Sequence, residues 1–219
     1  MSRPLLLGHR GLRTRQGPVE NSCRAFDAAL QAGCDGFEFD VRLTLDGIPV
    51  ICHDPDHDGR RIANCSAEDL ALPQLHSILS GYGSRAFLDI ELKVPGLEKK
   101  AIEAIADSGT TYDRLVVSSF LPAVLQESRE LDSALPLGFL CDESTALPLW
   151  RDLPIDYVIV HHRLVTADLV EVVHSAGKKL FTWTVNRPED MLRLAKWSVD
   201  GIISDDPSVL VSTLRSFSR

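Results

Sequence analysis

Two acidic side chains, Glu38 and Asp40, lie two positions apart within the run Gly36–Val41. Successive side chains of an extended strand point to opposite faces, so these carboxylates share one face while Phe37 and Phe39 share the other. Two like charges this close raise one another's pKa unless a cation lies between them. The spacing therefore indicates a bound metal ion on the acidic face of this strand.

Residues with related chemistry end other apolar runs of the chain. His9 and Arg10 follow Leu5–Leu7, and His53 follows an apolar run that begins at Val50. An imidazole can accept or donate a proton near neutral pH. Glu91 and Lys93 share one face of a further run because they are also two positions apart. The resulting set of three carboxylates, two imidazoles and two cations predicts a reaction site: His9, Arg10, Glu38, Asp40, His53, Glu91 and Lys93.

A purely structural explanation exists for several of these residues. Glu38 and Asp40 could form a buried ion-pair network with Arg10 and Lys93, although the two accompanying histidines favour catalysis.

Single residues that end the other apolar runs can likewise have either a structural or a functional role. His9 alone would be better explained as a core histidine, but His53 in an equivalent position favours a catalytic pair. A core position and a site position explain Trp183 about equally well. His161 also ends an apolar run. Asp205 is equally suited to cap the last helix and to contact a ligand.

Predicted strands and helices alternate along the whole chain. Helices are predicted at 22–33, 72–79, 97–106, 122–131, 144–150, 167–176, 188–197 and 207–217. The eight main strands contain Leu5, Phe37, Phe87, Leu115, Leu135, Tyr157, Leu180 and Ile202. This alternation predicts a (β/α)8 TIM barrel of the α/β class, in which the site lies at the carboxyl ends of the strands. A doubly wound sheet is the alternative, but no glycine-rich phosphate-binding sequence follows the first strand.

The chain is predicted to form one domain over residues 1–219, with a short insertion after the second strand at about 54–80. Residues 54–64 of this insertion are polar, and 58–61 are predicted to be a loop. The 219 residues of the chain are 44% hydrophobic and 25% charged, which is typical of one globular domain.

The formal net charge of −8 argues against nucleic acid or an anionic membrane as the main partner, and favours a small-molecule substrate. Five cysteines without CxxC spacing are predicted to be free thiols.

No apolar run reaches membrane-spanning length, so no stable membrane insertion is expected. The first strand follows Pro4, which leaves no room for a signal peptide, and we expect a cytoplasmic protein. The acidic surface fits a monomer and a small assembly equally well.

Taken in order, the motifs resemble those of the glycerophosphodiester phosphodiesterase family. They span nearly the whole chain: His9-Arg10-Gly11, Glu20-Asn21, Glu38-x-Asp40, His53-Asp54, Glu91-x-Lys93, Trp183-Thr184-Val185-Asn186 and the stretch Asp200–Asp205. Two departures stand out. Val19 replaces the proline of the family's Pro-Glu-Asn stretch, and the insertion that usually covers the substrate is trimmed to about 56–79, which implies a more open site.

The resemblance implies a TIM barrel and a role for each motif residue. A divalent ion would be held by Glu38, Asp40 and Glu91. His9 and His53 would be the acid/base pair. Arg10 and Lys93 would contact the phosphate, Trp183 would line the alcohol side, and Glu20 would have a supporting role.

The activity expected from this resemblance is metal-dependent hydrolysis of glycerophosphodiesters to glycerol 3-phosphate and an alcohol. Oxygen ligands alone favour Mg²⁺, Ca²⁺ or Mn²⁺ over zinc. The attacking group is either water or a neighbouring hydroxyl that forms a cyclic phosphate. Alternatives are a phospholipase-D-like or cyclising phosphodiesterase acting on lysophospholipids or sphingolipids, a metal-dependent hydrolase of a non-phosphorus substrate, and a barrel retained as a binding module.

Overall fold

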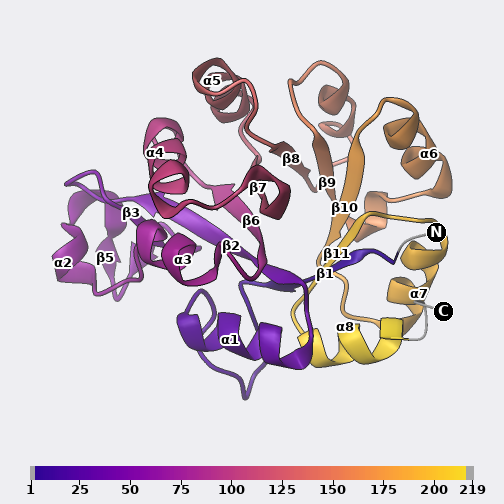
Figure 1. Cartoon of the computed structure of the whole chain (residues 1–219), viewed down its shortest axis with the longest axis horizontal. Helices are drawn as coiled ribbons and strands as arrows, with labels where there is room; N and C mark the ends of the chain where they lie inside the picture. Colours follow the sequence, from indigo (N-terminus) through magenta and orange to yellow (C-terminus); the bar gives the residue numbers. More distant parts are fainter. Residues whose placement is uncertain (1–2, 216–219) are drawn as a thin grey trace.

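The computed structural model describes residues 3–215, which form a closed barrel of eight parallel strands (Figure 1). The strands are β1 (Leu5–His9), β2 (Gly36–Leu43), β6 (Phe87–Leu92), β7 (Leu115–Ser119), β8 (Leu137–Cys141), β9 (Tyr157–His161), β10 (Lys179–Trp183) and β11 (Gly201–Ser204). Strand β1 pairs with β2 on one side and with β11 on the other. This closure confirms the predicted TIM barrel and excludes the open doubly wound sheet.

Helices cover the outside of the barrel, as Figure 1 shows. They are α1 (Cys23–Ala32), α3 (Leu75–Tyr82), α4 (Glu98–Ser108), α5 (Pro122–Leu131), α6 (Ala167–Ser175), α7 (Pro188–Lys196) and α8 (Pro207–Leu214). Short 3₁₀ helices are η2 (Tyr112–Arg114), η3 (Leu147–Arg151) and η4 (His162–Leu164). The short helix predicted at 144–150 is thus η3, and the predicted end of the last helix at Phe217 lies outside the described residues.

Local sequence explains where the first helix begins and ends. Ser22 accepts a hydrogen bond from the backbone N–H of Ala25 at 3.3 Å, which satisfies one of the free donors at the start of α1. Gly33 ends the helix with a φ of +102°, a conformation that glycine adopts without strain.

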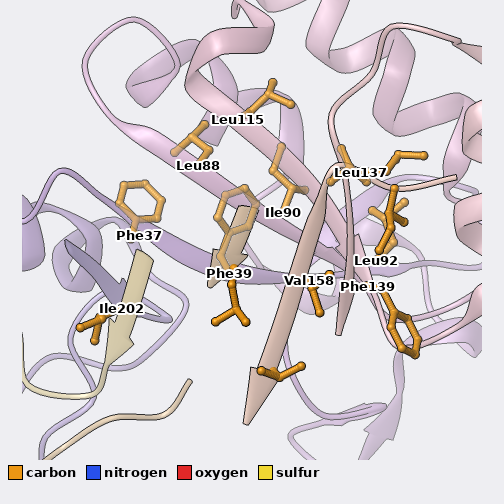
Figure 2. Close-up of a cluster of buried hydrophobic side chains, with 14 of the residues drawn as sticks. Phe37, Phe39, Leu88, Ile90, Leu92, Leu115, Leu137, Phe139, Val158 and Ile202 are labelled. Carbon is orange, nitrogen blue, oxygen red and sulfur yellow. The ribbon is translucent and has the colours of Figure 1, made fainter. Parts of the chain in front are cut away.

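Period-two alternation divides the buried side chains into two cores. Phe37, Phe39, Leu88 and Ile90 point outward from the barrel and pack against the helices (Figure 2). The ring of Phe37 stacks on Phe26 of α1 with 4.2 Å between centroids. A second, smaller core fills the barrel interior with inward-facing side chains from every strand except β2: Leu7, Phe87, Val116, Leu140, Tyr157, Ile159, Phe181 and Ile203. This interior core forms an apolar base beneath the carboxyl ends of the strands.

The insertion between β2 and β6 projects beyond the ring of helices, at the left of Figure 1. It contains β3 (Pro49–Ile51), β4 (Asp56–His57), β5 (Arg60–Arg61), η1 (Ile62–Asn64) and α2 (Ala67–Leu70). Strand β3 runs antiparallel to β2, and β4 and β5 form a two-stranded hairpin. Its own small core consists of Val50, Ile62, Ala67 and Leu70.

Two predictions for this insertion were wrong. Part of the segment expected to be a loop forms the β4–β5 hairpin. The helix expected from Leu72 begins only at Leu75, because Gln74 is extended and forms an isolated β-bridge with Val50.

All five cysteines are free thiols. Among the described residues, no helix combines the length and the apolar character needed to cross a bilayer.

Candidate active site

The fold brings most of the predicted site residues to one cavity at the carboxyl ends of the strands. The cavity has a volume of about 220 Å³. It is lined by His9, Arg10, Glu38, His53, Glu91, Lys93, Phe120, Leu140, Asp142, Trp183 and Ile203. Asp40 lies directly behind this lining, in contact with Arg10 and Lys93, and Glu20 lies on the outer side of Arg10.

Three buried carboxylates lie together at one side of the cavity, two in its lining and Asp40 behind them. Glu38, Asp40 and Glu91 each offer an oxygen, and these oxygens lie within 4.8 Å of one another. The sheet explains their proximity, since Asp40 of β2 is the register partner of Glu91 of β6. An all-oxygen donor set of this kind suits a hard divalent cation.

Lys93 and Arg10 compensate part of this negative charge. The Lys93 Nζ atom lies 2.9 Å from Asp40 Oδ1 and 2.7 Å from Glu91 Oε1. The Arg10 Nε atom lies 3.1 Å from Asp40 Oδ2, but its N–H is not directed at that oxygen, so this contact is an ion pair only. The ion-pair alternative considered from the sequence is therefore present around Asp40.

Glu38 is the carboxylate that this ion-pair network leaves least satisfied. Its Oε2 accepts the backbone N–H of Arg10 at 3.0 Å and lies 3.8 Å from His9 Nε2. Its Oε1 is buried and has no hydrogen-bond partner within residues 3–215. Burying a carboxylate oxygen without a partner is costly, and a cation bound at this position would compensate for that cost.

The pKa values follow from burial and charge. Burial raises the pKa of Glu38 well above its ordinary value, and the Asp40 and Glu91 charges add to the effect. Burial also raises the pKa of Glu91, to about 7. For Asp40, burial acts in the same direction, but Lys93 and Arg10 outweigh it and lower the pKa to about 2. A divalent cation beside Glu38 and Glu91 would favour their ionised forms.

His9 is oriented by an acidic residue from the other end of the chain. Its Nδ1 lies 2.7 Å from Oδ1 of Asp205, and Asn186 donates to the other Asp205 oxygen at 2.7 Å. With a proton on Nδ1, the Nε2 atom faces Glu38 and the cavity. Burial raises the pKa of Asp205, but the hydrogen bonds from His9 and Asn186 and the charges of His9 and Arg13 together outweigh it, and the net pKa is lowered.

Asp205 does not cap the last helix. Asp206 does so, accepting the backbone N–H of Val209 at 3.0 Å. The capping alternative for Asp205 was therefore wrong by one position.

His53 has a matching acidic partner but a more open environment. Its Nδ1 lies 2.7 Å from Asp54 Oδ1, and its backbone carbonyl accepts the Arg42 Nε–H at 2.8 Å. The His53 side chain is 37% exposed, compared with 10% for His9. Burial lowers the pKa of His53, so the neutral imidazole is favoured near pH 7.

Glu20 connects Arg10 to the acid that orients His9. It accepts Arg10 Nη1 at 2.6 Å and Arg13 Nε at 2.5 Å. Arg13 Nη1 in turn lies 3.6 Å from Asp205 Oδ1. These contacts form one chain of ion pairs along the rim, and Arg13 was not identified from the sequence.

Asn21 is a second residue whose position at the site was missed. Its side-chain amide donates to Asp40 Oδ2 at 2.8 Å, and its Oδ1 accepts the backbone N–H of Asp40 at 3.3 Å. The residue has a φ of +56°, which asparagine tolerates better than most residues. The only sequence signal was its place beside Glu20 in the motif.

The opposite side of the cavity is aromatic and apolar. Trp183 and Phe120 meet edge to face, with ring centroids 5.6 Å apart, and Trp183 also contacts His161 at 5.6 Å. Trp183 thus belongs to both the interior core and the cavity wall. Phe120 and Asp142 follow β7 and β8, so applying the strand-end rule to those two strands would have found them.

The closed parallel barrel and the acids, imidazoles and cations at the carboxyl ends of its strands define a (β/α)8-barrel enzyme. A sequence profile of the glycerophosphoryl diester phosphodiesterase family matches residues 9–99 and 87–209. The chain belongs to this family and is an enzyme of the phosphoric diester hydrolase class.

Individual relatives agree over nearly the whole length. A glycerophosphodiester phosphodiesterase of Caldanaerobacter subterraneus subsp. tengcongensis is 32% identical, covering 96% of this chain and 98% of its own length. The structure of an Oleispira antarctica phosphodiesterase in complex with the product sn-glycerol-3-phosphate has 26% identity and a TM-score of 0.80, with 97% of each chain covered. A glycerophosphodiester phosphodiesterase from Parabacteroides distasonis has 25% identity and a TM-score of 0.86, covering 100% of this chain and 99% of its own.

Proposed function

We propose that this enzyme hydrolyses glycerophosphodiesters to glycerol 3-phosphate and a free alcohol by metal-dependent acid/base catalysis. The observation that carries the proposal is the convergence of two imidazoles, two cations and three carboxylates on one cavity of about 220 Å³. The product named in the Oleispira antarctica complex supports the choice of substrate.

Glu38, Asp40 and Glu91 would hold the divalent cation. The unpartnered Oε1 of Glu38 and the all-oxygen donor set support this assignment. Such a set favours Mg²⁺, Ca²⁺ or Mn²⁺ over zinc, which prefers nitrogen and sulfur ligands. When bound, the ion supplies positive charge against the phosphoryl oxygens, where negative charge increases in the transition state.

His9 and His53 are the proposed proton-transfer pair. Each has its Nδ1 beside a carboxylate, which leaves Nε2 as the atom that can exchange a proton with substrate. One Nε2 would take the proton of the attacking hydroxyl, and the other would deliver a proton to the departing alkoxide oxygen. General acid and general base groups each typically contribute about 10²–10⁴-fold to the rate.

Arg10 and Lys93 are the proposed phosphate-binding residues. Both line the cavity, and both are already held in place by carboxylates. Cations fixed before substrate arrives stabilise charge on the phosphoryl group without reorganising during the reaction. Glu20 supports this arrangement through its hydrogen bond to Arg10, and Trp183 supplies an apolar surface for the carbon atoms of the alcohol side.

A phospholipase-D-like or cyclising reaction on lysophospholipids or sphingolipids is the second candidate. A groove of about 350 Å³ adjoins the cavity at His53 and carries apolar side chains of Val19, Ile51 and Leu72. Val19 is 79% exposed, so an acyl chain could bury it. Phosphorus NMR of the products separates the two activities, since free glycerol 3-phosphate forms only in the first, and a lipid-bearing phosphate, open or cyclic, only in the second.

The proposal is tested by a substrate panel of glycerophosphocholine, glycerophosphoethanolamine, glycerophosphoglycerol and a lysophospholipid, each assayed with Mg²⁺, Ca²⁺ and Mn²⁺. We expect release of glycerol 3-phosphate, its loss after treatment with a chelator, and its recovery when one of the ions is returned. Turnover that is equal in chelator would contradict the metal requirement. Absence of turnover on every glycerophosphodiester would contradict the proposed function.

A further inference from the structure

One acidic residue of the cavity lies on its aromatic side, away from the carboxylate cluster. Asp142 directly follows β8 and lines the cavity together with Phe120, Leu140 and Trp183. Glu38 and Glu91, the other acids of the lining, are both buried, whereas Asp142 is exposed. Asp142 therefore places a charge at the mouth of an otherwise apolar wall.

The Asp142 carboxylate has no hydrogen-bonded or ion-paired partner in the described chain, although its charge acts on the nearby His161. Within residues 3–215, no hydrogen bond or ion pair reaches its oxygens. The acids of the neighbouring groove differ, since each of them already has a basic partner. Glu20 is bonded to two arginines, Asp54 to His53, and Asp56 to Arg61. Asp142 is thus the acid at the rim that is available to a ligand.

The aromatic surface beside Asp142 adds a second kind of attraction. Phe120 and Trp183 are in edge-to-face contact and form a continuous aromatic wall of the cavity. Aromatic rings attract ammonium and quaternary ammonium groups through the negative charge of their faces. A carboxylate beside aromatic rings can bind a cation that carries apolar substituents.

The charges that line the cavity are complementary to those of a zwitterionic substrate. Asp142 follows β8, which lies across the barrel from β1 and Arg10, while Lys93 lies between them, with its Nζ atom 6.0 Å from the centroid of the Phe120 ring. A substrate that carries a phosphate anion and an ammonium group on its alcohol would find an opposite charge at both ends. An alcohol without charge would meet only the phosphate-binding side.

We propose that Asp142 is a specificity-determining residue, which together with Phe120 and Trp183 selects glycerophosphodiesters whose alcohol carries an ammonium or trimethylammonium group. The inference rests on the proposed function and names the substrate class within it. The competing role for Asp142 is hydrogen bonding to hydroxyls of the glycerol, which all substrates of the enzyme share.

A matched pair of substrates separates these roles. Glycerophosphocholine is compared with the glycerol phosphate ester of 3,3-dimethylbutanol, in which a carbon atom replaces the nitrogen and the positive charge is lost at nearly constant shape. The quantity measured is the ratio of kcat/KM for the charged substrate to kcat/KM for the neutral one. We expect the unaltered enzyme to favour the charged substrate, and D142N to lower the ratio about three- to tenfold.

Two further variants complete the experiment. E143Q removes the neighbouring acid, which shares an adjoining surface hollow with Asp142 but does not line the cavity, and should leave the ratio as it is. D142K places a positive charge at the same position and should lower the ratio further than D142N does.

The outcomes also separate this inference from the proposed function. A ratio that D142N leaves unchanged, including an equal loss on both substrates, would overturn the specificity role while leaving the hydrolase activity intact. Failure of the unaltered enzyme to cleave either ester, with glycerophosphoglycerol still cleaved, would also overturn the specificity role alone. Absence of turnover on every glycerophosphodiester would instead refute the proposed function, and this inference with it.

Discussion

The Nδ1 atom of His9 lies 2.7 Å from Oδ1 of Asp205, although 196 positions separate the two residues in the chain. The contact exists because β1 and β11 are neighbours in the closed barrel and both end at the same rim. His53 has an equivalent contact with Asp54, which is adjacent in sequence. Both proposed proton-transfer groups are therefore held through Nδ1 by a carboxylate.

Replacing Asp205 by asparagine should reduce activity without removing the imidazole. An amide oxygen can accept a hydrogen bond from the Nδ1–H but cannot stabilise a positively charged ring, so kcat should fall about 10- to 100-fold. The pH dependence of kcat/KM should shift as well, which a merely structural role would not cause. D206N is the matched control, because asparagine caps a helix about as well as aspartate, so the variant should leave both the stability and the pH profile nearly unchanged.

Removing either imidazole should nearly abolish turnover. H9A and H53A each delete one proposed proton-transfer group, and a loss of about 10²–10⁴-fold in kcat is expected for each. Circular dichroism and thermal unfolding should remain close to those of the unaltered protein for H53A, since His53 is partly exposed. Full activity in either variant would refute the acid/base assignment.

Metal affinity should depend on Glu38. E38Q keeps the size of the side chain but removes its charge, so Mn²⁺ should bind about 10- to 100-fold more weakly to the purified protein. Calorimetric titration of the chelator-treated protein measures this without reference to catalysis. Equal Mn²⁺ affinity in E38Q and the unaltered protein would show that Glu38 is not a ligand.

A buried acid beneath the site makes a separate prediction about stability. Asp89 is fully buried beside Glu38 in the barrel interior, and it accepts a hydrogen bond from Ser118 at 2.6 Å. Burial raises its pKa from 3.8 to about 7. Between these two values the folded state holds a proton that the unfolded state has released. The contribution of Asp89 to the free energy of unfolding is therefore fully present below pH 3.8 and is lost as the pH rises through about 7.

D89N removes this titration while keeping a similar shape. Relative to the unaltered protein, its free energy of unfolding should increase between pH 5 and pH 8, by on the order of 1–3 kcal/mol. Urea unfolding of both proteins in chelator, across this range, measures the difference. A difference that does not vary with pH would show that Asp89 has an ordinary pKa.

Local pattern was sufficient for the strand-borne part of the site. Glu38, Asp40 and Glu91 lie on inward faces because side chains alternate along a strand, and strand ends meet at one rim in a barrel. His9, Arg10 and Lys93 follow from the same two rules. These rules need no knowledge of which strands are neighbours.

Contacts that depend on loops and on barrel closure were not predictable in this way. The His9–Asp205 hydrogen bond requires the pairing of the first and last strands. The place of Asn21 depends on a backbone turn with positive φ, and the late start of α3 depends on a bridge between Gln74 and Val50. In each case the deciding interaction joins segments that are distant in the sequence, and the local pattern of residues does not show that they meet in the fold.

The most direct test of the central claim is a crystal structure of the enzyme with Mn²⁺ and glycerol 3-phosphate. We predict an anomalous manganese peak bounded by oxygens of Glu38, Asp40 and Glu91, with the phosphate between the Nε2 atoms of His9 and His53. A manganese ion bound elsewhere, or a phosphate within reach of neither imidazole, would contradict it.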